Sequence, residues 1–149
     1  MRIVMRSSVL ALSLVVGGIA IGAVPAFGAV GPHAVKAPER VHVIIKNATT
    51  PTGDQGAYVG SGGVGAKILF TAHVGQKVIL TVDNQSFMQH NFVASPFHVN
   101  KMISAGATST ITFTPTKAGM VKWDCPTPCG DWSMSHMGYM EGYVKVLAK

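Results

Sequence analysis

Short runs of β-branched and alternating apolar residues, separated by turn-forming residues, recur along most of the chain. Ile111 and Phe113 occupy alternate positions in one such run, so both side chains face the same side of a strand. Runs of this kind predict seven strands, at residues 41–47, 67–71, 77–82, 90–94, 108–114, 120–124 and 142–147. No segment after the N-terminal region keeps a helical period. The pattern predicts an all-β fold, an antiparallel Greek-key β-sandwich.

The longest interruption of this series is rich in glycine. Residues 48–66 contain Pro51 and six glycines, which predicts either a long surface loop or an ordered excursion across the sheet. Apart from this segment, internal repeats and low-complexity tracts are absent from the sequence. Glycine-rich phosphate loops and nucleophile elbows are absent as well.

The N-terminal region differs from the rest of the chain in composition. Arg2 and Arg6 precede a stretch without charges at 7–32. A basic start, an apolar centre and small residues before a cleavage site are the features of a secretory signal peptide, with cleavage expected before Ala29. The alternative is a retained membrane anchor, because the 22 residues of 9–30 are long enough to cross a bilayer.

We therefore divide the chain into a signal peptide or membrane anchor at 1–28, a linker at 29–40 and one domain at 41–149. Either form of the N-terminal segment places the domain outside the cytoplasm, in the periplasm or another extracytoplasmic compartment. If the segment is retained, residues 7–30 associate the protein with the membrane.

The charge of the chain excludes one class of partner. Charged residues make up 12% of the sequence, against roughly 25% in an average soluble domain. Without residues 1–28, ten basic residues remain against six acidic ones, and the basic residues are scattered without a run or interleaved aromatic residues. Nucleic-acid binding is therefore not expected. A surface with few carboxylates also loses few ion pairs on acidification, which would suit an acidic periplasm.

The segment 125–140 carries the candidate chemistry, because it places two cysteines, one histidine and three methionines between two predicted strands. Thiolate, imidazole and thioether are soft to borderline ligands that suit copper in both of its oxidation states. The strand end holds Cys125 on a rigid element, and the loop after it can bring Cys129, His136 and a methionine to the same point. A hard, oxygen-preferring ion would need carboxylates, of which this segment has few.

A further ligand is expected from a neighbouring strand, because one loop rarely encloses a metal by itself. His90 begins an apolar strand and precedes Cys125 by 35 residues. It reaches the loop only if the two strand ends are adjacent, as they would be in a Greek-key sandwich. The other histidines fit structural or surface roles, with His98 as a reserve ligand.

The order of these motifs resembles that of the cupredoxin family. The similarity covers roughly 41–149 and rests on His90-Asn-Phe, on the alternating segment 105–114, and on Ala-Gly-Met-Val-Lys-Trp-Asp leading into Cys125. In that family an early histidine, a cysteine at a strand end, a later histidine and a methionine hold the copper.

The resemblance assigns these roles to His90, a cysteine, His136 and Met140, with Met137 as the alternative methionine. A Cys-x-x-x-Cys motif followed by His and Met is similar to the binuclear CuA site of cytochrome oxidase subunit II and nitrous oxide reductase. There both thiolates bridge two coppers, and the carbonyl of the residue between them is a weak ligand. That carbonyl would belong to Thr127.

This chain departs from the CuA pattern in its loop. Ser133 occupies the position at which CuA domains have a histidine, and His136 follows three residues later. The longer interval from Cys129 to His136 resembles the mononuclear site of periplasmic cupredoxins from acidophilic iron oxidisers, which associate with a respiratory oxidase. In that case Cys129 binds copper and Cys125 is free or structural. We favour one copper ion and keep a CuA-type pair as the alternative.

The resemblance implies an exported electron-transfer protein whose partner is a c-type cytochrome or a terminal oxidase. The alternatives are a CuA-type subunit of a cytochrome c oxidase and a periplasmic copper chaperone. The sequence shows no second copper-binding histidine cluster, activated nucleophile or paired carboxylates, so the isolated chain is not expected to be an enzyme. A structural disulfide between Cys125 and Cys129 remains open, although so short a loop would gain little stability from it.

Overall fold

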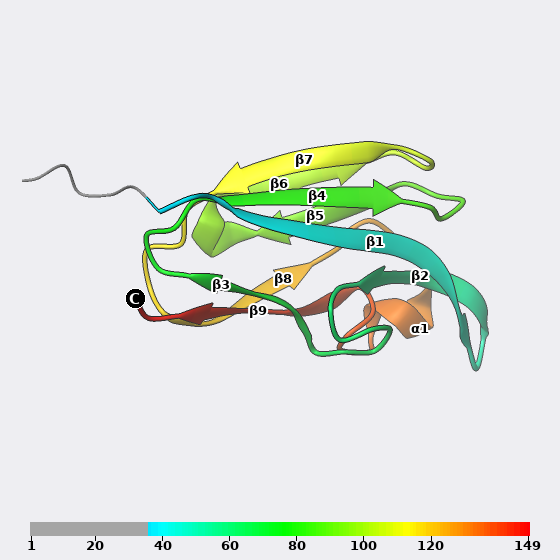
Figure 1. Ribbon diagram of the computed structural model, residues 1–149. Coiled ribbons are helices and arrows are strands. Elements are labelled where there is room, and N and C mark those ends of the chain that lie inside the picture. Colours follow the sequence, from blue (N-terminus) through cyan, green and yellow to red (C-terminus); the bar gives the residue numbers. More distant parts are fainter. Residues whose placement is uncertain (1–35) are drawn as a thin grey trace, which may run out of the picture. The chain divides into compact units, whose positions relative to one another are not determined.

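The structure is a computed structural model that describes residues 36–149, and the predicted signal or anchor segment at 1–28 lies outside them. Nine strands, one 3₁₀ turn and one short helix follow each other along this part of the chain (Figure 1). They are β1 (Glu39–Thr50), β2 (Gly53–Val59), β3 (Ile68–His73), β4 (Val78–Asn84), β5 (His90–Ala94), η1 (Ser95–Phe97), β6 (Val99–Ile103), β7 (Thr108–Phe113), β8 (Gly119–Asp124), α1 (Asp131–Met134) and β9 (Glu141–Leu147). Among these residues no helix is long and apolar enough to span a membrane.

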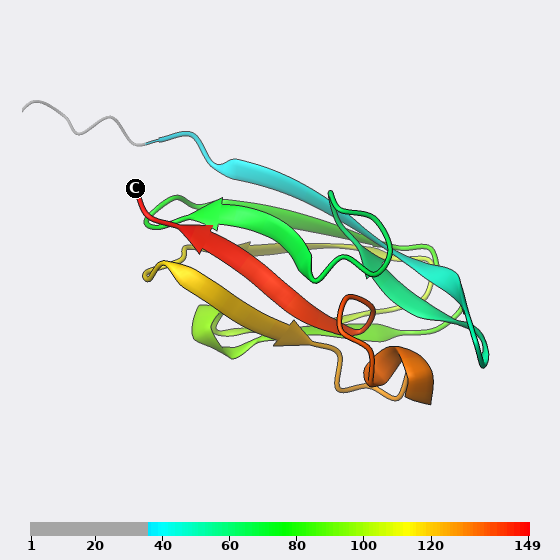
Figure 2. The same cartoon turned by 90° about the horizontal axis from the view of Figure 1, so that it is seen from below.

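The strands form two facing layers, as predicted for a β-sandwich. One sheet has the order β2-β1-β4-β7 and the other the order β3-β9-β8-β5-β6. Alternate residues of each strand point into the space between the sheets, where Leu80, Phe92 and Trp123 are almost fully buried. The rings of Phe92 and Trp123 stack with centroids 5.5 Å apart. Figures 1 and 2 show the C-terminus at one end of the sandwich and α1 at the other.

The prediction of a purely antiparallel sandwich is wrong, because two neighbouring pairs run parallel. β1 pairs with β4 in parallel, and β3 pairs with β9 in parallel. Parallel neighbours need a connection that returns the chain to its starting end. Between β1 and β4 that connection consists of β2 and β3, and β3 belongs to the opposite sheet.

The sequence pattern also missed two strands. About half of the glycine-rich segment 48–66 belongs to strands, namely the end of β1 and all of β2. These two strands pair as a hairpin, with Ile44 opposite Val59 at one end and Thr50 opposite Gly53 at the other. β6 follows the turn at Pro96 and pairs with β5 at the edge of its sheet. Neither strand has a clear apolar alternation, because the first half of β2 consists of glycines and polar residues and the middle of β6 is exposed.

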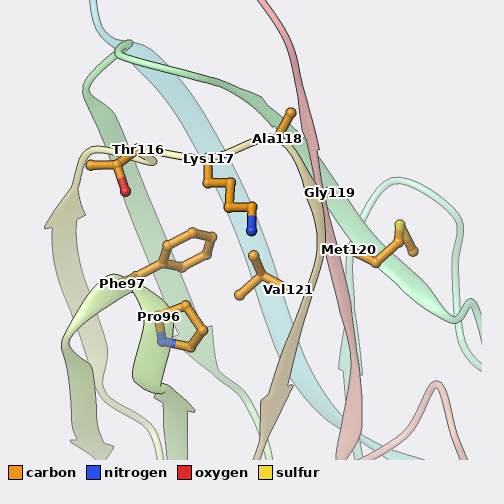
Figure 3. A pocket seen from close by; sticks show the side chains of 8 residues that line it. All are labelled: Pro96, Phe97, Thr116, Lys117, Ala118, Gly119, Met120 and Val121. Carbon is orange, nitrogen blue, oxygen red and sulfur yellow. The ribbon is translucent and has the colours of Figure 1, made fainter.

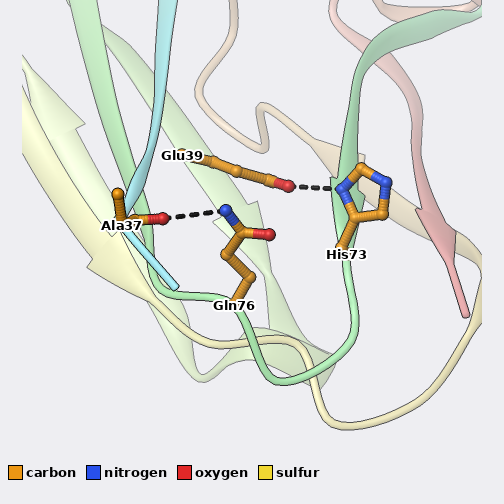
Figure 4. A network of polar contacts seen from close by, with 4 residues as sticks. All are labelled: Ala37, Glu39, His73 and Gln76. Atoms are coloured by element: carbon orange, nitrogen blue, oxygen red, sulfur yellow. Dashed lines mark hydrogen bonds and ion pairs between the residues drawn. The ribbon is translucent and has the colours of Figure 1, made fainter. Parts of the chain in front are cut away.

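The end of the sandwich near the C-terminus is closed by polar contacts (Figure 4). His73 at the end of β3 donates a hydrogen bond from its Nδ1 atom to the carboxylate of Glu39 at the start of β1, and Gln76 donates a hydrogen bond to the carbonyl of Ala37 over 2.8 Å. These contacts tie the beginning of the domain to the turn between β3 and β4. They also give His73 a structural role, as its sequence context suggested.

Tyr58 provides a test of core packing. Its ring lies 4.8 Å from that of Trp123 between centroids, and its hydroxyl is buried without a hydrogen-bond partner among the described residues. Burial and the nearby thiols of Cys125 and Cys129 raise its pKa well above the usual value.

Because an unpaired buried hydroxyl costs stability, Tyr58→Phe should raise the free energy of unfolding by about 1 kcal/mol in urea denaturation. Tyr143→Phe, at a half-buried position, serves as the control, and a clear loss of stability in Tyr58→Phe would contradict the unpaired hydroxyl.

Candidate metal centre

Three adjacent strands bring the predicted ligands to the same end of the sandwich. His90 is the first residue of β5, Cys125 directly follows β8, and Met140 directly precedes β9. β8 lies between β9 and β5 in the sheet, with Asp124 opposite both Glu141 and Val93. The ends of these strands therefore converge, as the hypothesis of a shared site requires.

The side chains of His90, Cys125 and Cys129 form a buried group of three metal-binding atoms, all within 4.8 Å of one another. The two sulfur atoms lie 3.1 Å apart. The Nδ1 atom of His90 lies 3.1 Å from the Sγ of Cys129 and 4.0 Å from the Sγ of Cys125. Both cysteines are free thiols, because a disulfide would bring the sulfurs to about 2.05 Å.

Backbone groups hold both thiols in place. The backbone N–H of Asn91 donates to the Sγ of Cys125 over 3.2 Å, and the backbone N–H of Cys125 donates to the carbonyl of Met140 over 2.8 Å. The Sγ of Cys129 lies 2.7 Å from the carbonyl oxygen of Thr127. The loop between β8 and α1 thus folds back so that both sulfurs face His90.

The two thiols share their protons unequally. The hydrogen bond from Cys129 lowers the pKa of Cys125 to about 4, although burial works in the opposite direction. The contacts with His90 and with the N–H of Asn91 add to this lowering. The same hydrogen bond and burial raise the pKa of Cys129. The pair therefore presents one thiolate readily, and a cation at this point would favour loss of the second proton.

Met140 lies beside His90, against the backbone of β2. Its side chain is only 1% exposed. A Cβ atom added to Gly56 would lie 2.5 Å from both the Cε1 of His90 and the Cε of Met140. The two side chains therefore flank one point on β2, and only a glycine leaves room for both. The close approach explains a glycine in the middle of a strand, which the sequence alone presented as a loop residue.

His136 is not brought to this group. Its side chain is exposed and stacks on the ring of Trp132, with centroids 3.8 Å apart and an interplanar angle of 10°. Its Nδ1 atom donates to the carbonyl of Trp132 over 2.6 Å. The structure thus gathers His90, Cys125 and Cys129 with Met140 beside them, and the role of His136 as a ligand stays a prediction.

Sequence reasoning missed two residues on the other side of His90, one that contacts its ring and one that supports the first. Ser86 lies in the loop between β4 and β5, and its Oγ is 2.8 Å from the Nε2 of His90. Asn84, the last residue of β4, is in turn hydrogen-bonded to Ser86. A polar pair shortly before a candidate ligand is a weak signal, because serine and asparagine are also common in turns.

A pocket of about 320 Å³ lies at the opposite end of β8 from the cysteines. Figure 3 shows it between Pro96 and Phe97 on one side and the segment 116–121 on the other. Its lining contains no cysteine, histidine or carboxylate. The candidate chemistry of the described residues is therefore concentrated at the end that holds His90.

No family model and no curated protein matches the chain. Solved structures do match. A chain of a heme-copper terminal oxidase dimer is 15% identical with a TM-score of 0.53, over 73% of this chain and 65% of the other. The blue copper oxidase of Nitrosomonas europaea is 19% identical with a TM-score of 0.55, over 76% and 40%. The copper-containing nitrite reductase of Thermus scotoductus SA-01 is 17% identical with a TM-score of 0.53, over 76% and 28%.

The matched proteins are longer than this chain, which covers less than two thirds of each of them. At these identities the likeness concerns the fold. The described domain has a cupredoxin-like fold, as the motifs of the sequence predicted.

Gly56 allows a test of the packing beside His90. Gly56→Ala places a methyl group against His90 and Met140, so we expect a loss of about 1–3 kcal/mol in the free energy of unfolding of the metal-free protein. The control is Gly62→Ala, which puts a methyl 2.6 Å from the Cβ of Ala66 on an exposed loop that can yield. Equal losses in the two variants would show that the site is not tightly packed at this point.

Proposed function

We propose that this protein binds copper through His90 and a thiolate of the Cys125–Cys129 pair, which is Cys129 in a one-copper site, with Met140 as an additional weak ligand, and that it carries electrons. The observation behind the proposal is the convergence of one imidazole nitrogen and two sulfurs within 4.8 Å in a buried position. The donor set fits copper, because it combines thiols with imidazole and a nearby thioether and includes no carboxylate.

The surrounding fold suits electron transfer. Copper in such a site would supply a one-electron redox couple. His90, Cys125 and Met140 sit at the ends of three paired strands, so their positions are fixed before any ion binds. Ligands that do not move between oxidation states keep the reorganisation that opposes electron transfer small. Burial of the thiols also keeps water and external thiols away from them.

One copper ion is the preferred reading of the site. The group contains a single imidazole, and His136 lies outside it. The CuA-type alternative draws on a different observation: the sulfurs are adjacent at 3.1 Å, and the carbonyl of Thr127 lies 2.7 Å from one and 3.8 Å from the other. Two thiolates so arranged could bridge two ions.

The proposed setting follows from the N-terminal sequence and the resemblance. The carrier is exported to the periplasm or a similar compartment, and it exchanges electrons with a c-type cytochrome or a terminal oxidase. By itself it catalyses no reaction. A periplasmic copper chaperone is the competing function, since a chaperone would release copper rather than cycle it between oxidation states.

Copper content and the electron paramagnetic resonance spectrum test the proposal together. The purified protein, reduced and then loaded with Cu(II), should bind one ion per chain and give a four-line mononuclear spectrum with an intense visible colour. Two ions per chain with a mixed-valence spectrum would establish the CuA-type alternative. If the cysteines form a disulfide that persists and no copper binds, the site is structural.

Cysteine-to-serine variants separate the electron carrier from the chaperone. Cys129→Ser should abolish the intense colour, because that colour requires a thiolate bound to Cu(II). A chaperone that relied on histidine and methionine would keep tight copper binding in this variant. The matched change Cys125→Ser identifies the ligand in a one-copper site: the colour survives in whichever variant retains the copper-binding thiolate, and a CuA-type site loses its spectrum in both.

A further inference from the structure

The charged side chains of the domain are separated along the length of the sandwich. The sequence has six carboxylate side chains, all of them in described residues. Five lie at the end that holds His90, close to the ends of β4 and β8 or the starts of β2, α1 and β9, namely Asp54, Asp83, Asp124, Asp131 and Glu141. The sixth is Glu39 at the opposite end, where it accepts the hydrogen bond from His73.

Exposed cations occupy the end that has so few carboxylates. Lys36 and Arg40 lie on either side of the first residue of β1, Lys77 directly precedes β4, and Lys117 lies in the turn between β7 and β8. None of these four side chains forms an ion pair with a described residue. We call this surface, defined by Lys36, Arg40, Lys77 and Lys117, the basic end.

Backbone hydrogen bonds bring the segments of the basic end together. The N–H of Glu39 donates to the carbonyl of Lys77 over 2.8 Å, and the N–H of Gly75 donates to the carbonyl of Pro115 over 2.8 Å. The strand start, the turn before β4 and the turn after β7 are therefore neighbours. Cations that are scattered along the sequence thus form one positively charged surface.

Apolar groups are accessible beside these cations. The pocket of about 320 Å³ opens next to Lys117, whose side chain extends over it, and Phe97 and Val121 contribute to its walls (Figure 3). Met120, in the same segment, is 51% exposed. Surfaces that combine cations with accessible apolar groups bind at the boundary of a bilayer, where the cations meet lipid phosphates and the apolar groups meet the acyl chains.

The point at which the chain enters the domain favours a bilayer over an acidic protein as the partner. The uncharged stretch 7–32, expected to be a signal peptide or a membrane anchor, joins the domain at Lys36, within the basic end. If the apolar residues 9–30 are retained in a membrane, the chain from residue 30 to Lys36 can span at most roughly 20 Å. The basic end would then be the part of the domain that lies next to the lipid.

We infer that the basic end docks on a bilayer surface that contains anionic phospholipids. The field of such a surface attracts the four cations and repels the five carboxylates at the other end, so it also orients the sandwich. The end that holds His90 then points away from the bilayer, toward the aqueous compartment. That a soluble redox partner would reach the copper site from there rests on the proposed function, whereas the docking does not.

Acetylation of lysine amines, read by mass spectrometry, tests the docking on the full chain without copper. The protein is mixed with vesicles of phosphatidylcholine, alone or with phosphatidylglycerol added. Lys36, Lys77 and Lys117 should react about threefold or more slowly on the anionic vesicles than on the neutral ones. Reaction rates on the two vesicles should be equal for exposed lysines elsewhere in the domain, namely Lys46, Lys67 and Lys101. In about 1 M salt, where the Debye length is about 3 Å, the protection should disappear.

Two triple variants of equal net charge identify the surface. Replacement of Lys36, Lys77 and Lys117 by glutamine should lower the ratio of the partition coefficients for anionic and neutral vesicles about 100-fold, at about fivefold per lysine. The matched replacement of Lys46, Lys67 and Lys101 should leave this ratio nearly unchanged. All six side chains are exposed and lack ion pairs with described residues, so both variants should fold. Taking the ratio removes the contribution of the apolar stretch 7–32, which both vesicles share.

Three results would overturn the inference: equal acetylation of the basic end on both vesicles, equal protection of the control lysines, or equal losses in the two triple variants. A partner that is an acidic protein would give the first of these, because the vesicles contain no protein. Protection by inorganic phosphate at the same ionic strength would also contradict a bilayer surface, since it would indicate a site for a free anion. Failure to bind copper would refute the proposed function and leave the docking unaffected.

Discussion

The site depends on one constraint: β8 pairs with both β5 and β9, so that the ends of three strands meet. Val93 and Glu141 both lie opposite Asp124, the last residue before Cys125. A shift of one residue in either pairing would turn alternate side chains to the other face of the sheet. The core beneath, with Phe92 stacked on Trp123, makes such a shift costly because it would expose both rings. The contact between imidazole and thiols is therefore a consequence of the register of the sheet.

Much of the fold could be predicted because its signals are local. The strands around Ile111, Trp123 and His90 have alternating or β-branched apolar residues, and the structure confirms them with small shifts at their ends. β2 could not be predicted in this way, since Gly56 in its middle is explained by the close approach of His90 and Met140, which come from distant parts of the chain. Parallel pairing was missed for a related reason, because single-strand patterns carry no information on the direction of the neighbour.

The candidate site was predictable in its rigid part and less so in its loop. His90, Cys125 and Met140 are attached to strand ends, so placing the strands places these residues. His136 follows α1 in a segment whose conformation depends on local contacts, and in the structure its ring stacks on Trp132. Ser86 contacts the imidazole through tertiary structure, and sequence spacing alone gives no reason to distinguish it from an ordinary turn residue.

The backbone of β2 at Gly56 packs directly against the side chains of His90 and Met140. Side chains at this place could adjust by changing rotamers. A strand that is paired along its length to β1 cannot move aside without breaking the hydrogen bonds between the two strands. The room beside His90 and Met140 is consequently limited by main-chain geometry. The resistance of the proposed site to distortion would therefore derive in part from the β1–β2 hairpin, an element that contributes none of the proposed ligands.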